Sequence, residues 1–142
     1  METPDFKQLV DGFVQSVKQT LGITLTYDEK GVENLENQVE MMRDVFVQIK
    51  DTVSAEELEK QKQAVAIKLG AFVGECVIKE FDGKWEFSEE MGWHIRLNKE
   101  DIKINVIGKV LKQLDNGKED SVLSLYRTIP VIIKDLKEKN EN

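Results

Sequence analysis

The chain has 142 residues, of which 33% are charged and 40% are hydrophobic, and its formal net charge is −7. A chain of this length can bury a core of its own, so we predict a single domain over residues 1–142. Lysines and acids are interspersed and form no basic stripe, so we expect neither a nucleic-acid partner nor binding to an anionic membrane.

Apolar residues at helical spacing predict a first helix that begins at Thr3-Pro4 and ends at Gly22. Thr3 is a suitable N-cap, and proline suits the first helical position. The apolar stripe consists of Phe6, Leu9, Val10, Phe13, Val17 and Leu21. Residues 23–27, ITLTY, then predict either a short edge strand or an extended link.

Two further helices are predicted between Asp28 and Glu80. The second helix follows Asp28 and has an apolar stripe made of Leu35, Val39, Met42, Phe46 and Ile49. Ser54 and Glu57 form a capping-box pattern at the start of the third helix, which runs from Ala55 to Glu80. The apolar arc of this third helix exceeds half its circumference, which is typical of a central helix covered on more than one side.

Gly70 and Gly74 lie on one face of the third helix, one turn apart. Each glycine costs the helix roughly 1 kcal/mol relative to alanine. We therefore expect that their lack of side chains lets another element approach the helix closely.

The apolar spacing changes from 3.6 to 2 after Asp82-Gly83. Three short alternating stretches follow, centred on Trp85 and Phe87, on Trp93, Ile95 and Leu97, and on Ile102, Ile104 and Val106. They predict a three-stranded antiparallel meander. We expect the third helix to cover its apolar face.

Helical spacing returns at Ile107 and predicts a short helix that ends at Asn116-Gly117. A last helical segment is interrupted by Pro130, so either the helix kinks there or two helices meet with Thr128 as a cap. The predicted fold class is α+β, with N-terminal helices, a small three-stranded antiparallel meander packed on a long central helix, and C-terminal helices.

His94 and Cys76 are the only residues of their kinds. His94 lies on the polar face of the middle strand, near Glu89, Glu90 and Arg96, and the pattern favours a solvated side chain over a general base or a metal ligand. Cys76 lies in the apolar arc near the C-terminal end of its helix, which favours a buried, inert thiol over a nucleophile.

Glu75, Trp85, Trp93 and His94 are the candidate binding residues. Glu75 and Lys79 have the i, i+4 spacing of a surface ion pair, which competes with a role for Glu75 as a functional acid. The two tryptophans lie on alternating strand positions, which favours packing over an aromatic pocket. No catalytic, cofactor or metal signature is present, so we predict no cofactor and no enzymatic activity.

A single cysteine excludes an intrachain disulfide. The first residues show neither the basic nor the apolar region of a signal peptide, and no apolar run reaches the length of about 18 residues that spans a bilayer. We therefore expect a cytoplasmic protein.

Three stretches together resemble the small bacterial proteins catalogued as domain of unknown function 3806. They are LGITLTYDEKGVENLENQVEMMR at 21–43, LGAFVGECVIKEFDGKW at 69–85 and VIGKVLKQLDNGKEDSVLSLYRTI at 106–129. The chain differs from the family pattern at Ile104-Asn105, where a strand leads into a helix. The resemblance implies no activity and assigns no functional residue.

Two functions remain open. The first is a non-catalytic interaction module, for example an immunity-like protein, that binds another protein through its acidic surface or a sheet face. The alternative is a small-molecule binding protein or enzyme with a pocket between the third helix and the sheet, near Glu75, Trp85 and His94. The sequence leaves the oligomeric state open.

Overall fold

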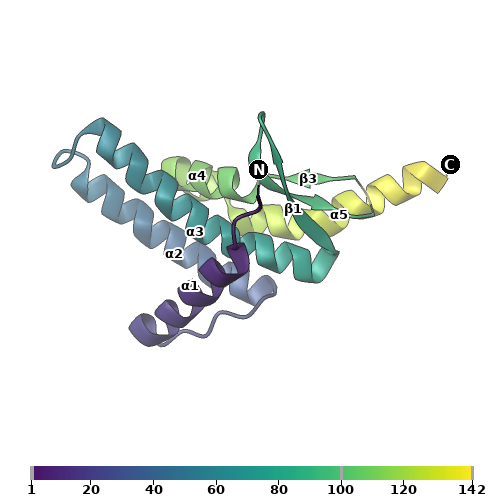
Figure 1. Cartoon of the computed structure of the whole chain (residues 1–142), viewed down its shortest axis with the longest axis horizontal. Helices are drawn as coiled ribbons and strands as arrows, with labels where there is room; N and C mark the ends of the chain where they lie inside the picture. Colours follow the sequence, from purple (N-terminus) through teal and green to yellow (C-terminus); the bar gives the residue numbers. More distant parts are fainter. Residues whose placement is uncertain (1, 100, 142) are drawn as a thin grey trace.

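The computed structural model describes residues 2–99 and 101–141, and it has helices on both sides of a small sheet in chain order (Figure 1). The α+β class, with the meander between N-terminal and C-terminal helices, is confirmed. The elements are α1 (Phe6–Leu21), α2 (Glu29–Ile49), α3 (Ala55–Phe81), β1 (Gly83–Ser88), β2 (Gly92–Leu97), β3 (Lys103–Ile104), α4 (Val106–Asn116), the 3-10 helix η1 (Gly117–Asp120) and α5 (Val122–Glu141).

Polar side chains cap the N-termini of the five α-helices. Asp5, Asp28, Ser54, Asn105 and Ser121 each accept a hydrogen bond from the backbone amide three residues further along. These bonds satisfy amides that a helix start leaves without an intrahelical partner. The cap predicted at Ser54 is confirmed, whereas the predicted cap at Thr3 is wrong because α1 begins later, behind Asp5.

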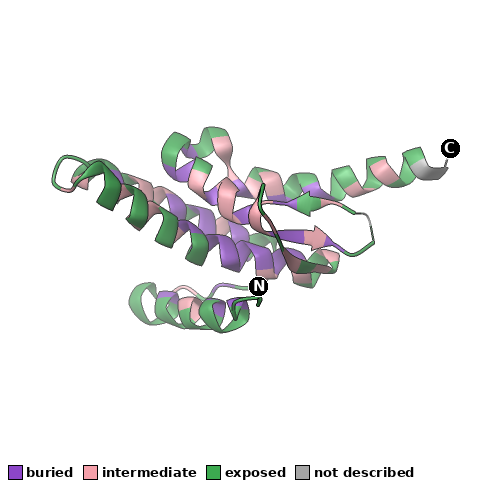
Figure 2. Cartoon of the chain, turned by 45° about the horizontal axis from the view of Figure 1, so that its top comes forward, coloured by how far each residue is buried: buried purple, intermediate pink, exposed green. Residues whose placement is uncertain are grey.

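Helix α3 is the centre of the molecule. It packs against α1, α2, α4 and the sheet, and Figure 2 shows buried residues gathered along its middle and C-terminal half. The two glycines are contact points, as predicted. A Cβ at Gly70 would lie 2.7 Å from the Cα of Ile107 on α4, and one at Gly74 would lie 2.4 Å from Cζ2 of Trp85. Glycine at these two positions therefore lowers the helix propensity of α3 but allows α4 and β1 to pack closely against it.

The sheet has the order β1-β2-β3, with both pairs antiparallel. Trp85 pairs with Ile95, and Phe87 pairs with Trp93, so these residues share one face. Glu86 pairs with His94 on the other face. The third strand is shorter than predicted because Asn105 already caps α4 and Val106 is already helical.

Two open points are settled by the backbone. Residues 22–28 form an extended link between α1 and α2, not a strand. Helix α5 continues through Pro130 as one helix, which leaves the first of the two alternatives and rules out two separate helices. Thr128 does not cap a new helix; its hydroxyl donates to the carbonyl oxygen of Ser124, 2.7 Å away.

Candidate functional site

The four candidate residues divide between the two faces of the sheet. Glu75, Trp85 and Trp93 lie on the side of α3 and α1, whereas His94 belongs to the opposite face with Glu86. The structure therefore brings Glu75 and Trp85 together and leaves His94 outside that group. The predicted pocket near all three residues does not form as a unit.

Glu75 is bonded to the sheet. Its Oε2 accepts a hydrogen bond from the indole Nε1 of Trp85, with 3.2 Å between the two atoms. The side chain is half-buried at the end of the central helix. The hydrogen-bonded partner of Glu75 therefore comes from β1 and not from its own helix, while Lys79 lies beside it on α3.

The tryptophans pack against α1. The rings of Phe6 and Trp85 stack with centroids 4.0 Å apart, and Phe6 meets Trp93 edge-on at 5.8 Å. Phe87 covers the other side of Trp93 at 5.4 Å. The packing interpretation is confirmed, and this aromatic group fixes the start of α1 over the sheet.

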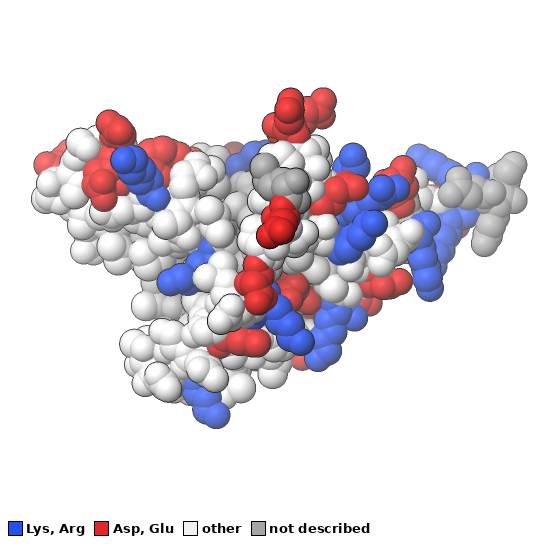
Figure 3. Space-filling view, viewed as in Figure 1, with Lys and Arg blue, Asp and Glu red and all other residues white. Residues whose placement is uncertain are grey.

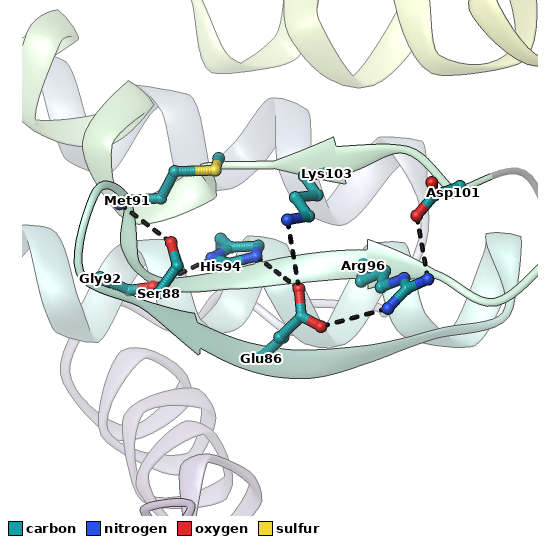
Figure 4. Close-up of polar contacts among 8 residues, drawn as sticks. All are labelled: Glu86, Ser88, Met91, Gly92, His94, Arg96, Asp101 and Lys103. Carbon is teal, nitrogen blue, oxygen red and sulfur yellow. Dashed lines mark hydrogen bonds and ion pairs between the residues drawn. The ribbon is translucent and has the colours of Figure 1, made fainter.

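His94 is fully buried, so the prediction of a solvated histidine is wrong. Its Nδ1 lies 2.9 Å from the carbonyl oxygen of Gly92, and its Nε2 lies 3.0 Å from Oε2 of Glu86 (Figure 4). Both ring nitrogens thus lie within hydrogen-bonding distance of an oxygen, one from the backbone and one from Glu86. Long side chains of β1 and β3 flank the ring. The alternation of residues along β2 gives the face on which His94 lies, but not whether neighbouring side chains bury it.

Glu86 holds the centre of this polar group. Its carboxylate also lies 3.3 Å from Nη1 of Arg96 and 3.9 Å from Nζ of Lys103. The hydrogen bond with His94, followed by those with Arg96 and the charge of Lys103, lowers the pKa of Glu86 against the opposing effect of burial. These groups satisfy one another across three strands, which indicates a role in holding the sheet together.

Cys76 is buried, as predicted. Burial raises the pKa of its thiol, and the negative charges of Asp28, Glu80 and Glu75 act in the same direction. A thiol in these surroundings is protonated and shielded from reagents, which is the opposite of what a nucleophile needs.

The residue types that hold metals do not gather in the described part of the chain. Within residues 2–99 and 101–141, no group of three or more His, Cys, Asp or Glu side chains is placed to hold an ion. Among the helices described there, none has the length and apolar character needed to cross a membrane.

A pocket of about 410 Å³ opens beside Glu75, between α1, the 22–28 link and α3. Two carboxylates, two lysines and a phenol line it over an apolar floor. We call it the Glu75 pocket; its residues are Lys7, Val10, Asp11, Tyr27, Glu75, Ile78 and Lys79. Side chains of both charge signs gather on the surface where α1 begins (Figure 3).

Hydrogen bonds hold the walls of the Glu75 pocket. The hydroxyl of Tyr27 donates to Oδ1 of Asp11, 3.2 Å away, which links the extended stretch to α1. Burial, followed by the charge of Asp11, raises the pKa of Tyr27, so the phenol remains a donor at neutral pH. The ammonium of Lys79 lies 5.7 Å from the Tyr27 ring centroid, within cation–π range.

Sequence reasoning identified Glu75 but missed Lys7, Asp11 and Tyr27. Lys7 and Asp11 are four residues apart and flank the buried Val10, which is the one local signal of a shared face. Tyr27 comes from a link without periodicity. Only the docking of α1 on α3 brings these residues to Glu75, and periodicity carries no information about that docking.

Comparisons with protein-family models, with curated proteins and with solved structures found no match for this chain. The resemblance to domain of unknown function 3806 stays a prediction.

Proposed function

We propose that the protein binds a small zwitterionic molecule of the amino-acid type in the Glu75 pocket. The observation that carries this proposal is the arrangement of two carboxylates and two ammonium groups around one concave site with an apolar floor. Convergent polar groups in a pocket of this kind are typical of small-molecule sites. The proposal is for binding without chemistry.

The carboxylates supply the site for the cationic end of the ligand. One oxygen of each is engaged by a wall residue, Oδ1 of Asp11 by Tyr27 and Oε2 of Glu75 by Trp85. Each carboxylate keeps its second oxygen for a ligand, since a carboxylate accepts at both. An ammonium group between α1 and α3 therefore receives charge-assisted bonds from both helices.

Lys7 and Lys79 supply the site for the anionic end. Both line the pocket, one on α1 and one on α3, so a carboxylate on the ligand bridges the same two helices. The four charges of the pocket sum to zero, which favours a ligand that carries one charge of each sign. Ile78, which is half-buried, offers a surface for a short apolar side chain.

The test is a thermal-shift and calorimetric screen of free amino acids. Each amino acid is compared with two analogues, the amine that lacks its carboxylate and the carboxylic acid that lacks its ammonium group. A ligand that binds the folded state raises the Tm according to its affinity and concentration. We expect at least one amino acid to do so, and its single-charge analogues to bind more weakly.

Variants place the binding at the pocket. Glu75→Gln keeps an oxygen that accepts from Trp85 but loses the charge, and Asp11→Asn does the same toward Tyr27. Glu59→Gln on the exposed side of α3 is the control, because Glu59 accepts only from Gln63. If no amino acid binds, or if binding survives both pocket variants, the proposal is wrong.

Protein binding is the second candidate. Met41 and Val45 are large apolar side chains exposed one turn apart on α2, and exposed apolar pairs on a charged surface are common at interfaces. The apolar face of the sheet is covered by α3 and Phe6, so a partner would use the acidic surface or α2. Recovery of a stoichiometric partner from the native host by the wild-type chain, and its loss with Met41→Asp, would support this function.

A further inference from the structure

A second pocket, of about 230 Å³, lies between β3, the start of α4 and α5. It shares no residue with the Glu75 pocket. In Figure 1 the chain passes from β3 into α4 next to the first half of α5. We call this second pocket the lysine pocket, after the residue type that gives it its charge.

The charge of this pocket has one sign. Lys103, Lys109 and Lys112 line it, and within the described residues no carboxylate does. Two of the lysines have a carboxylate outside the pocket, Lys103 with Glu86 at 3.9 Å and Lys109 with Asp120 at 3.4 Å. In a chain of net charge −7, a site lined only by cations favours an anionic ligand.

The start of α4 adds a polar group. Oδ1 of Asn105 accepts from the amide of Gly108, 2.9 Å away, so this helix terminus is already capped. The same bond fixes the side-chain amide of Asn105, whose nitrogen is a donor. Recognition of an anion here thus depends on lysines and an amide donor, and not on the helix terminus.

The rest of the lining is apolar. Ile104 and Ile129 are buried, and Ile132 on α5 is 38% exposed beside them. Such a surface offers nothing to a small hydrated anion such as phosphate, but it removes an alkyl chain from water. The charge and the apolar surface together favour a ligand that has both an anionic group and an alkyl chain.

We propose that the lysine pocket binds a single-chain amphipathic carboxylate of the fatty-acid type. The carboxylate lies among the lysine ammonium groups and the Asn105 amide, and the alkyl chain lies along Ile104, Ile129 and Ile132. Lys112 belongs to the charged part of this lining and Ile132 to its apolar part.

The test is calorimetric titration of the whole chain with decanoate, below its critical micelle concentration. Decanol and acetate serve as probes of the chain alone and of the charge alone. We expect decanoate to bind one molecule per chain and both analogues to bind at least about tenfold more weakly. Equal binding of decanol, equal binding of acetate, or no binding of decanoate would overturn the proposal.

Paired variants locate the site. Lys112→Glu changes the charged part of the lining and Ile132→Glu changes its apolar part, both at exposed positions, so the fold is expected to persist. Lys118→Glu on η1 and Val131→Glu, at a residue 56% exposed on α5, make the same changes outside the pocket. We expect the first two variants to weaken decanoate binding by about tenfold or more and the controls to leave it unchanged. Equal loss in variant and control would show non-specific adsorption and refute the site.

Discussion

The indole nitrogen of Trp85 lies 3.2 Å from Oε2 of Glu75, so β1 is hydrogen-bonded to α3 at the wall of the Glu75 pocket. The bond depends on the residue before Glu75. Gly74 leaves room for the Trp85 ring directly on the helix, because a Cβ there would lie 2.4 Å from the ring. Two successive residues of α3 therefore position one side chain of the sheet, and that side chain positions a carboxylate of the pocket.

Removing the acceptor at Glu75 tests this bond. We expect Glu75→Ala to lower the free energy of unfolding by about 1–2 kcal/mol, because it leaves the indole donor half-buried and unpaired. Glu75→Gln should lower it less, since the amide oxygen still accepts. Urea denaturation followed by tryptophan fluorescence measures both. A double-mutant cycle with Trp85→Phe should show coupling, and strictly additive losses would mean that the bond contributes nothing.

Substituting alanine for three helical glycines should stabilise the protein at one position and destabilise it at the other two. Gly12→Ala on α1 meets no atom within 4 Å and should stabilise the chain by about 1 kcal/mol through helix propensity. Gly74→Ala forces the Trp85 ring to move, and Gly70→Ala meets the backbone of Ile107, so both should destabilise by about 1–3 kcal/mol. Thermal unfolding gives the order. Because backbone atoms move less readily than a side chain, Gly70→Ala should lower the Tm the most. A Gly70→Ala variant with a raised Tm would contradict this packing.

Much of the fold follows from the sequence because helices and strands differ in the period of their apolar residues. The change of period at Asp82-Gly83 predicts the end of α3 and the start of the meander. Gly70 and Gly74 predict close contacts, since glycine in an apolar helical stretch needs a reason. Asn105 is one exception, because a polar residue that caps a helix also fits the alternating pattern of a strand.

The candidate site followed from the sequence only in part. Alternation places His94 on the polar face of β2 but says nothing about the length of the side chains beside it. Glu86 and Lys103 flank the ring from the neighbouring strands (Figure 4). The Glu75 pocket depends on how α1 docks on α3, and that docking rests on the contact of Phe6 with Trp85. Such contacts between distant residues leave no periodic signal in the chain.

Glu86 should contribute to the acid sensitivity of the fold. Its pKa in the folded chain lies below the ordinary value of 4.5, chiefly because of the hydrogen bond with His94. The folded state therefore binds this proton less tightly than the unfolded state does. The resulting stabilisation is complete above about pH 4.5 and is lost as the pH falls through the lowered pKa.

Urea denaturation of wild type and Glu86→Gln from neutral to acidic pH measures this contribution. The variant should be less stable at neutral pH and should lose less stability on acidification. Some acid sensitivity should remain, because hydrogen bonds from Thr26 and from Asn116 lower the pKa values of Asp28 and Asp120 as well. Glu90→Gln, an exposed change in the same hairpin, is the control. Parallel pH profiles for wild type and Glu86→Gln would contradict the role of Glu86.

Phe6 and Phe87 both contact Trp93, but they should differ in what they stabilise. Phe6 is 5% exposed and also stacks on Trp85, whereas Phe87 is 40% exposed at the edge of the sheet. Phe6→Ala should lower the free energy of unfolding by about 3 kcal/mol, the usual cost of removing a buried phenylalanine. Phe87→Ala should cost less than about half of that, because its ring is already partly in water.

The location of the damage separates a local role of Phe6 from a general one. Phe6 joins α1 to the sheet, so Phe6→Ala should shift tryptophan emission to longer wavelength and speed amide hydrogen exchange throughout α1 before it affects α3. It should also weaken any ligand of the Glu75 pocket, since Lys7 and Asp11 lie on α1. Phe87→Ala should leave exchange in α1 unchanged. If α1 keeps its protection in Phe6→Ala, then the contact of Phe6 with the two tryptophans is not what holds this helix in place.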